Sequence, residues 1–146
     1  MSFPLALQFL AVLALSFPST ISGQTAKTPA KQSLVQDYSF TIKADRGWTD
    51  TGLNLSPGDR IHIFGAVIDC GGSSPQKTHL PLPSAPAGAL LAKFQAEETP
   101  VVASPDADLP IVDPSHLYLG VNGWQCSGTV PVRVHVEWHQ SPKQAR

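Results

Sequence analysis

The feature that most constrains the fold is an alternating stretch near the end of the chain, residues 128–138 (GTVPVRVHVEW). Valine or tryptophan occupies every second position from Val130, and the polar residues Arg133, His135 and Glu137 lie between them. Because successive side chains of a β-strand point to opposite faces, this pattern predicts a strand with one buried and one exposed face. The buried face is expected to carry Val130, Val132, Val134, Val136 and Trp138.

Other short apolar segments precede this strand and are separated by Gly, Pro and Asp. Strands are predicted over residues 38–44, 48–55, 60–68, 88–95, 99–103 and 116–121, and loops over the Pro-rich residues 73–86 and the Pro- and Asp-rich residues 104–115. We find no convincing amphipathic helix. Short strands at regular spacing with Gly and Pro turns indicate an all-β fold, an antiparallel β-sandwich of two packed sheets.

The first residues differ in character from the rest. Residues 1–23 contain a short apolar run and no charged residue, and the first charge is Lys27. This segment predicts a signal peptide cleaved near Gly23, with an uncleaved membrane anchor as the alternative. We then expect a flexible leader over 24–36, the folded domain over 37–140 and a polar tail over 141–146. The mature protein is expected to be secreted or periplasmic, with no membrane contact after the signal is removed.

Charge and cysteine content narrow the possible partners. The chain has 10 Lys and Arg against 11 Asp and Glu, and no basic stripe, which argues against nucleic-acid binding. Cys70 and Cys126 are its 2 cysteines. In an exported protein, two cysteines are expected to form a disulfide, and a loop of this length would contribute about 4 kcal/mol in the chain-entropy model.

The sequence does not support a catalytic or a metal-binding site. Ser127 precedes a glycine but lies in no G-x-S-x-G motif. His135 and His139 are four residues apart, which on a strand separates them by roughly 13 Å, too far to share an ion. His62 alternates with isoleucines and is expected on a solvent face or in packing. The sequence therefore predicts a protein that is not an enzyme.

Two tryptophans are candidates for contact with a ligand. Trp48 is expected to be buried and to close the sandwich. Trp124 lies in a short loop flanked by glycines, where burial is harder to arrange. An exposed indole there would offer a flat apolar face to the C–H groups of a sugar.

Several segments together resemble the PA-IL-like family of galactophilic lectins. The resemblance lies in Trp48-Thr49-Asp50-Thr51-Gly52-Leu53, Pro57-Gly58-Asp59-Arg60-Ile61, residues 83–91 (PSAPAGALL), and the segment from His116 to Asn122 followed by Ser127-Gly128. Their order and spacing match over roughly residues 38–136. The resemblance implies a jelly-roll-like sandwich that binds galactosides through a calcium ion.

Carried over by position, the calcium ligands of the family are largely missing here. The carbonyl donor falls at or beside Cys70, and one asparagine is kept as Asn122. The aspartate position is Gly123, and two further asparagine positions are Gln125 and Cys126. Calcium takes six to eight oxygen ligands, so calcium is possible by resemblance but we predict no cofactor and no metal. A Cys70–Cys126 disulfide is the hypothesised replacement for the ion.

These observations predict a lectin-like module that binds a carbohydrate or glycoconjugate, of galactoside type by resemblance. The expected ligand-binding residues are Trp124 for stacking, Asn122 and Gln125 for sugar hydroxyls, and His79, which loosely matches a sugar-contacting histidine of the family. The alternative is a structural or protein-interaction sandwich that has lost sugar binding, because a fold does not determine a function.

Overall fold

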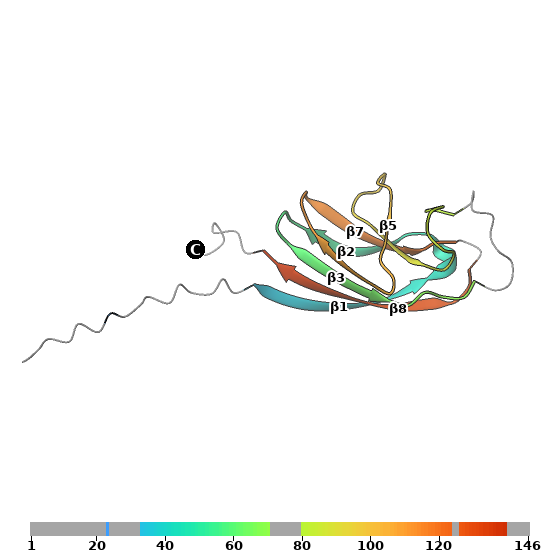
Figure 1. Ribbon diagram of the computed structural model, residues 1–146, viewed down its shortest axis with the longest axis horizontal. Helices are drawn as coiled ribbons and strands as arrows, with labels where there is room; N and C mark the ends of the chain where they lie inside the picture. The colour runs from blue at the N-terminus through green and yellow to red at the C-terminus, as the bar shows by residue number, and fades with distance from the viewer. Residues whose placement is uncertain (1–22, 24–32, 71–79, 124–125, 140–146) are drawn as a thin grey trace, which may run out of the picture. The chain divides into compact units, whose positions relative to one another are not determined.

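The part of the chain that the structure describes contains eight β-strands and one short 3-10 helix (Figure 1). The structure is a computed structural model that describes residues 23, 33–70, 80–123 and 126–139. Apart from Gly23, all of these residues belong to one compact unit, Lys31–Arg146. The elements are β1 (Leu34–Lys43), η1 (Ala44–Arg46), β2 (Thr49–Leu55), β3 (Arg60–Gly65), β4 (Leu90–Lys93), β5 (Val101–Val102), β6 (Asp106–Pro110), β7 (Ser115–Val121) and β8 (Thr129–Trp138).

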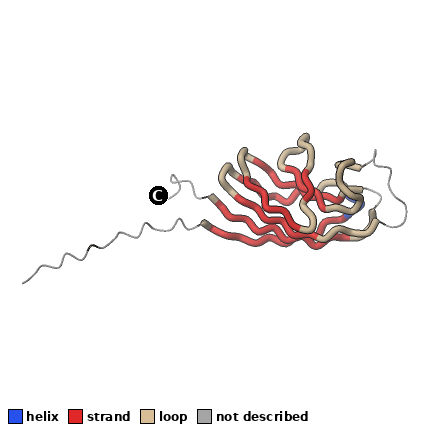
Figure 2. Tube along the Cα trace, in the orientation of Figure 1, coloured by secondary structure: helices blue, strands red, loops and turns tan. Residues whose placement is uncertain are grey.

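The strands form two four-stranded sheets in which every pair is antiparallel (Figure 2). Sheet A has the order β1-β8-β3-β6, and sheet B has the order β2-β7-β4-β5. Figure 1 shows β1, β8 and β3 in one layer and β2 and β7 in the other. The predicted all-β fold, an antiparallel β-sandwich, is confirmed.

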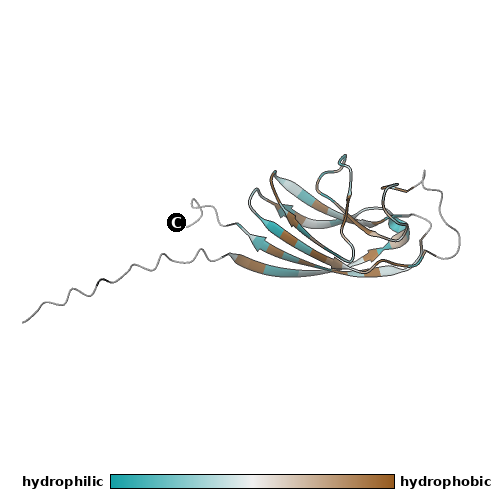
Figure 3. Cartoon of the chain, in the orientation of Figure 1, coloured by the Kyte–Doolittle hydropathy of each residue, from teal (hydrophilic) through white to brown (hydrophobic). Residues whose placement is uncertain are grey.

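β8 is one of the two inner strands of sheet A and follows the predicted alternation. It pairs with β1 from Leu34↔Trp138 to Lys43↔Thr129, and with β3 on its other side. The inward valines at 130, 132, 134 and 136 are at most 2% exposed, while Arg133 and Glu137 face solvent. Hydrophobic and hydrophilic segments accordingly alternate along the strands in Figure 3.

The core lies between the sheets and draws on both of them. Its buried side chains include Ile42, Ile61, Ile63, Val134 and Val136 from sheet A and Leu53, Leu90, Leu117, Leu119 and Val121 from sheet B. Burial of aliphatic side chains of this size contributes about 1.5–3 kcal/mol each. Cys126 belongs to the same cluster and is 1% exposed.

One predicted loop contains a strand. Residues 104–115 were expected to form a loop, but β6 occupies Asp106–Pro110 and pairs with β3. β6 is one of the two edge strands of sheet A, with Asp106, Asp108 and Pro110 exposed. An edge strand can carry charges and proline because only one side of its backbone enters the ladder, so its sequence lacks the usual strand signal.

The folded domain also begins earlier than expected. β1 starts at Leu34, three residues inside the expected leader, because its first residues pair with Trp138, Glu137 and Val136. Their side chains are exposed, so hydrophobic periodicity does not reveal them. The remainder of the expected signal peptide and leader, apart from Gly23 and Ser33, and the expected tail lie outside the described residues.

Trp48 lies elsewhere than expected. Its ring is half-buried against the outer side of sheet B, where a Cβ atom added to Gly120 would come within 3.0 Å of it. The Lys93 ammonium lies 4.4 Å from the centroid of the ring. Trp48 therefore covers an outer surface of sheet B and does not pack between the sheets.

Candidate functional site

The predicted disulfide is present and joins two loops at one end of the sandwich. Cys70 follows the segment after β3, and Cys126 precedes β8, with their Cα atoms 4.4 Å apart. Neither cysteine is therefore a free thiol. We call the surrounding residues the loop rim: residues 66–70, 80–88, 122–123 and 126.

Asn122, at the end of β7, ties the loop rim together through its side chain. Oδ1 accepts a hydrogen bond from the backbone N–H of Leu82 at 2.9 Å. Nδ2 donates to the carbonyls of Leu82, Ala85 and Pro86 at 2.9, 3.0 and 3.1 Å. The side chain has no exposed surface, and the backbone of the 80–88 loop satisfies both its donor and its acceptor, as a buried amide requires.

Close backbone packing completes the loop rim. Gly88 has a φ of +84°, and a Cβ atom there would lie 2.0 Å from the carbonyl oxygen of Ile68 and 3.1 Å from Sγ of Cys70. The backbone of Gly88 also donates to the Asn122 carbonyl at 2.9 Å and accepts from Ile68 N–H at 3.0 Å. Only glycine combines this conformation with this close approach, so residue 88 locks the two sides of the loop rim together.

The structure describes one of the four predicted ligand-binding residues. Asn122 is given a structural role, and its contact with a sugar stays a prediction. His79, Trp124 and Gln125 lie outside the described residues, although Gly123 and Cys126 on either side of the last two are placed. Gly123 and Cys126 are joined by a backbone hydrogen bond of 3.2 Å.

The described residues of the loop rim do not fit a calcium ion. Oδ1 of Asn122 already accepts from Leu82, Gly123 has no side chain, and Cys126 is held in the disulfide. A calcium site needs six to eight oxygen ligands. Within the described ranges, no three His, Cys, Asp or Glu residues are grouped so that they could hold a metal ion.

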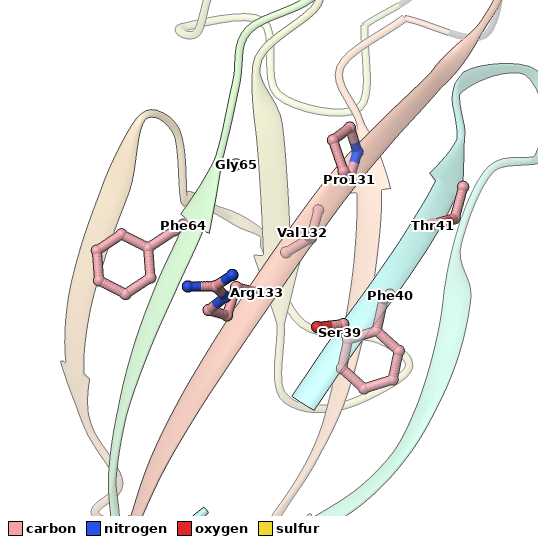
Figure 4. Close-up of a pocket in the computed structure, with 8 residues that line it drawn as sticks. All are labelled: Ser39, Phe40, Thr41, Phe64, Gly65, Pro131, Val132 and Arg133. Atoms are coloured by element: carbon pink, nitrogen blue, oxygen red, sulfur yellow. The ribbon is translucent and has the colours of Figure 1, made fainter. Parts of the chain in front are cut away.

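A second feature, which the sequence did not reveal, is the outer face of sheet A. The register places Phe64 of β3 and Ser39 of β1 on either side of Arg133 of β8 (Figure 4). A hollow of about 570 Å³, which we call the Phe64–Arg133 hollow, is lined by Ser39, Phe40, Thr41, Phe64, Gly65, Pro131, Val132 and Arg133. Alternation alone assigns residues to faces, but only the pairing of strands shows which outward residues become neighbours.

A smaller hollow of about 290 Å³ lies on the other side of Phe64 and includes Arg60, His62, His135 and Glu137. The imidazole of His62 stacks on the Phe64 ring with 4.3 Å between centroids. Its Nε2 is buried without a hydrogen-bond partner. The stacked rings of His62 and Phe64 therefore form one wall of this smaller hollow.

Two pairs of charged groups on this face are joined by hydrogen bonds. Arg60 donates to Asp108 at 2.7 Å, which raises the pKa of the guanidinium. His135 donates from Nδ1 to Asp37 at 2.8 Å. Arg133 is exposed and forms no ion pair or hydrogen bond with any residue that the structure describes.

The outer face of sheet B carries a polar cluster whose groups satisfy one another. The ring of His116 is hydrogen-bonded to Oδ1 of both Asn54 and Asp50. Asp50 also accepts from Gly52 N–H at 2.8 Å. These two contacts lower the pKa of the Asp50 carboxyl, the bond to His116 having the larger effect. The cluster links β2 to β7 where their register shifts.

The chain is similar to known proteins in structure and not in sequence. No known sequence family matches the chain, and no curated protein matches it either. A solved structure of IMPa metallopeptidase in complex with T-antigen is similar at 16% identity and a TM-score of 0.46, over 74% of this chain and 13% of that chain. IMPa from Pseudomonas aeruginosa in complex with an O-glycopeptide is similar at 16% identity and a TM-score of 0.44, over 76% and 13%. The chain thus spans about an eighth of the length of either structure.

Within the described ranges, no helix has the length and apolar character needed to cross a membrane.

Proposed function

We propose that this protein is an exported, non-catalytic module that binds carbohydrate without calcium, with a disulfide in place of the ion. The observation that carries the proposal is the Cys70–Cys126 bond. It joins the two loops between which the resemblance to PA-IL-like lectins locates calcium. A covalent link can hold two loops as an ion does, without needing oxygen ligands that the described residues lack.

The contacts of Asn122 and Gly88 support the same conclusion. Both act through hydrogen bonds and packing within the chain, so the loop rim needs no added group to hold its shape. A preformed site binds more tightly because less conformational entropy is lost on binding. The proposed contacts remain Trp124 for stacking, Asn122 and Gln125 for sugar hydroxyls, and His79 from the facing loop, and a galactoside remains the proposed sugar.

Export is supported by the chemistry of the disulfide. Disulfides form and persist in oxidising compartments and are rare in the cytosol. Together with the signal-like residues 1–23, this favours secretion or location in the periplasm.

A glycan array tests the proposal. The oxidised mature protein is applied with and without EDTA, beside Trp124→Ala and the double variant Cys70→Ser/Cys126→Ser. We expect binding to galactosides that EDTA does not change, that Trp124→Ala abolishes, and that the double variant weakens. Binding lost with EDTA would overturn calcium independence.

A protein-interaction module is the second candidate. It is favoured by β5, the edge strand of sheet B, where Val101 and Val102 are 39% and 41% exposed. Exposed apolar edges offer both backbone groups and side chains to another chain. A correctly folded protein that binds no glycan on the array would support this candidate over the first.

A further inference from the structure

A second ligand site, away from the loop rim, is indicated by Arg133, whose charge has no partner among the residues that the structure describes. Arg133 projects from the middle of β8 on the outer face of sheet A, beside Phe64 (Figure 4). The guanidinium of Arg60, on the same face, forms an ion pair with Asp108. A guanidinium has five N–H donors in a planar fork that matches a carboxylate, and those of Arg133 have no described partner.

Phe64 supplies a flat apolar wall to the same site. Its side chain is 43% exposed and lines both hollows, whereas His62 lines the smaller hollow alone. The two rings are nearly parallel, at 5°. His62 therefore covers one face of the Phe64 ring, and Phe64 remains partly exposed where it lines the Phe64–Arg133 hollow.

The remaining walls favour a sugar over a peptide. Ser39 and Thr41 of β1 line the hollow and carry hydroxyls. β8 and β3 pair with strands on both sides, so their backbone groups are used within the sheet. A peptide added as a strand needs free backbone groups at a sheet edge, which β1 and β6 offer but the two inner strands that carry Arg133 and Phe64 do not.

Two acids lie near Arg133 on this face, and neither forms an ion pair with it. Asp37 of β1 is diagonal to Arg133 and is hydrogen-bonded to His135. Asp106 of β6 lies opposite Phe64 on the side away from Arg133. Arg133 and Asp106 are thus two strands apart, or roughly 10 Å at the usual strand spacing. Over that distance, across a solvent-exposed face, their attraction is largely screened.

We propose that the Phe64–Arg133 hollow binds a sugar ring that carries a carboxylate, such as a uronic acid unit of a polysaccharide. Arg133 pairs with the carboxylate, Phe64 packs against the C–H face of the ring, and Ser39 and Thr41 contact its hydroxyls. The volume of about 570 Å³ falls within the range of small-molecule sites.

Titration of the oxidised protein with an oligomer of galacturonic acid, followed by NMR, tests the proposal. The methyl-esterified oligomer is the matched neutral ligand. We expect the acid form to bind, to shift the backbone signals of β1, β3 and β8, and to lose affinity in high salt. The ester is expected to bind at least about tenfold more weakly, because it lacks the charge that strengthens hydrogen bonds to arginine.

Three variants locate the binding. Arg133→Gln is expected to weaken the acid form about tenfold or more, while Arg60→Gln on the same face leaves it unchanged. Phe64→Ala is expected to weaken it as well, and thermal unfolding checks that each variant is folded. Trp124→Ala is expected to have no effect here, which separates this site from the loop rim. Equal affinity for acid and ester, an unchanged Arg133→Gln, or no binding at millimolar ligand would overturn the proposal.

Discussion

The buried side chain of Asn122 and the backbone of Leu82 form a reciprocal pair of hydrogen bonds, each 2.9 Å long, at the loop rim. The side-chain amide acts toward Leu82 as a neighbouring backbone would in a sheet. This pairing holds an irregular loop against the end of the sandwich.

Replacing Asn122 with alanine should destabilise the fold. The N–H of Leu82 and the buried carbonyl of Ala85 would lose their partner, while the carbonyls of Leu82 and Pro86 would keep backbone hydrogen bonds from Ala85 and Ala89. Since each unsatisfied buried group costs about 1–3 kcal/mol, we expect a loss of about 2–4 kcal/mol in the free energy of unfolding. Urea denaturation followed by tryptophan fluorescence measures it. The control Asn54→Ala removes one exposed hydrogen bond to His116 and should cost less than about 1 kcal/mol; equal losses would contradict the role assigned to Asn122.

Removing the disulfide should lower the free energy of unfolding, because the unfolded chain without the cross-link has more conformations available. Cys70 and Cys126 are 56 residues apart. The chain-entropy model assigns a closed loop of this length about 4 kcal/mol. We expect Cys70→Ser/Cys126→Ser to lose about that amount in urea denaturation and the reduced wild type to lose a similar amount. Alkylation with intact-mass analysis confirms the redox state of each sample. Two alkylated thiols in the unreduced protein would show that the bond does not form.

Gly88→Ala should be far more damaging than the same change at Gly52. Both glycines have positive φ, at +84° and +73°. A Cβ atom at residue 88 would lie 2.0 Å from the Ile68 carbonyl oxygen, whereas at residue 52 it would meet nothing within 4 Å. We expect about 1–2 kcal/mol for Gly52→Ala from backbone strain alone and about 3 kcal/mol or more for Gly88→Ala. Thermal and urea unfolding of the two variants would compare them, and similar losses would show that the approach at Gly88 can relax.

The Asp50–His116 contact should make stability fall in acid. The pKa of the Asp50 carboxyl lies below its ordinary value of 3.8, chiefly because His116 is hydrogen-bonded to it. A carboxyl whose pKa is lower when folded stabilises the protein above its ordinary pKa. That contribution is lost as pH falls below about 3.8 and through the folded value. NMR titration of the side-chain carboxyl should give a midpoint below 3.8 that rises in His116→Ala. A wild-type midpoint at or above 3.8 would contradict the contact.

The parts of the fold that could be predicted from sequence are those in which one strand face is buried. Val130 to Val136 alternate with polar residues because β8 has the core on one side and solvent on the other. β6 escaped prediction because an edge strand needs only one paired side, and Asp106 and Asp108 can point to water. The first residues of β1 escaped for a related reason, since only their backbones are engaged.

Some features of the candidate site could likewise be predicted from the sequence, and others could not. The pairing of Cys70 with Cys126 could be predicted because the chain has 2 cysteines and a signal-like start. The buried structural role of Asn122 could not be predicted. The sequence does not show whether the side-chain amide of an asparagine in a loop is hydrogen-bonded to the backbone or to a ligand.

The sequence by itself determined the sandwich, the alternation of β8 and the disulfide, because periodicity and composition are local properties of the chain. The tertiary structure alone decided that Ser39, Arg133 and Phe64 lie side by side on one face. These residues come from three strands that are far apart along the chain, and the register between strands is set by packing of the shared core. Neighbours across a sheet therefore become visible only once the strands are paired.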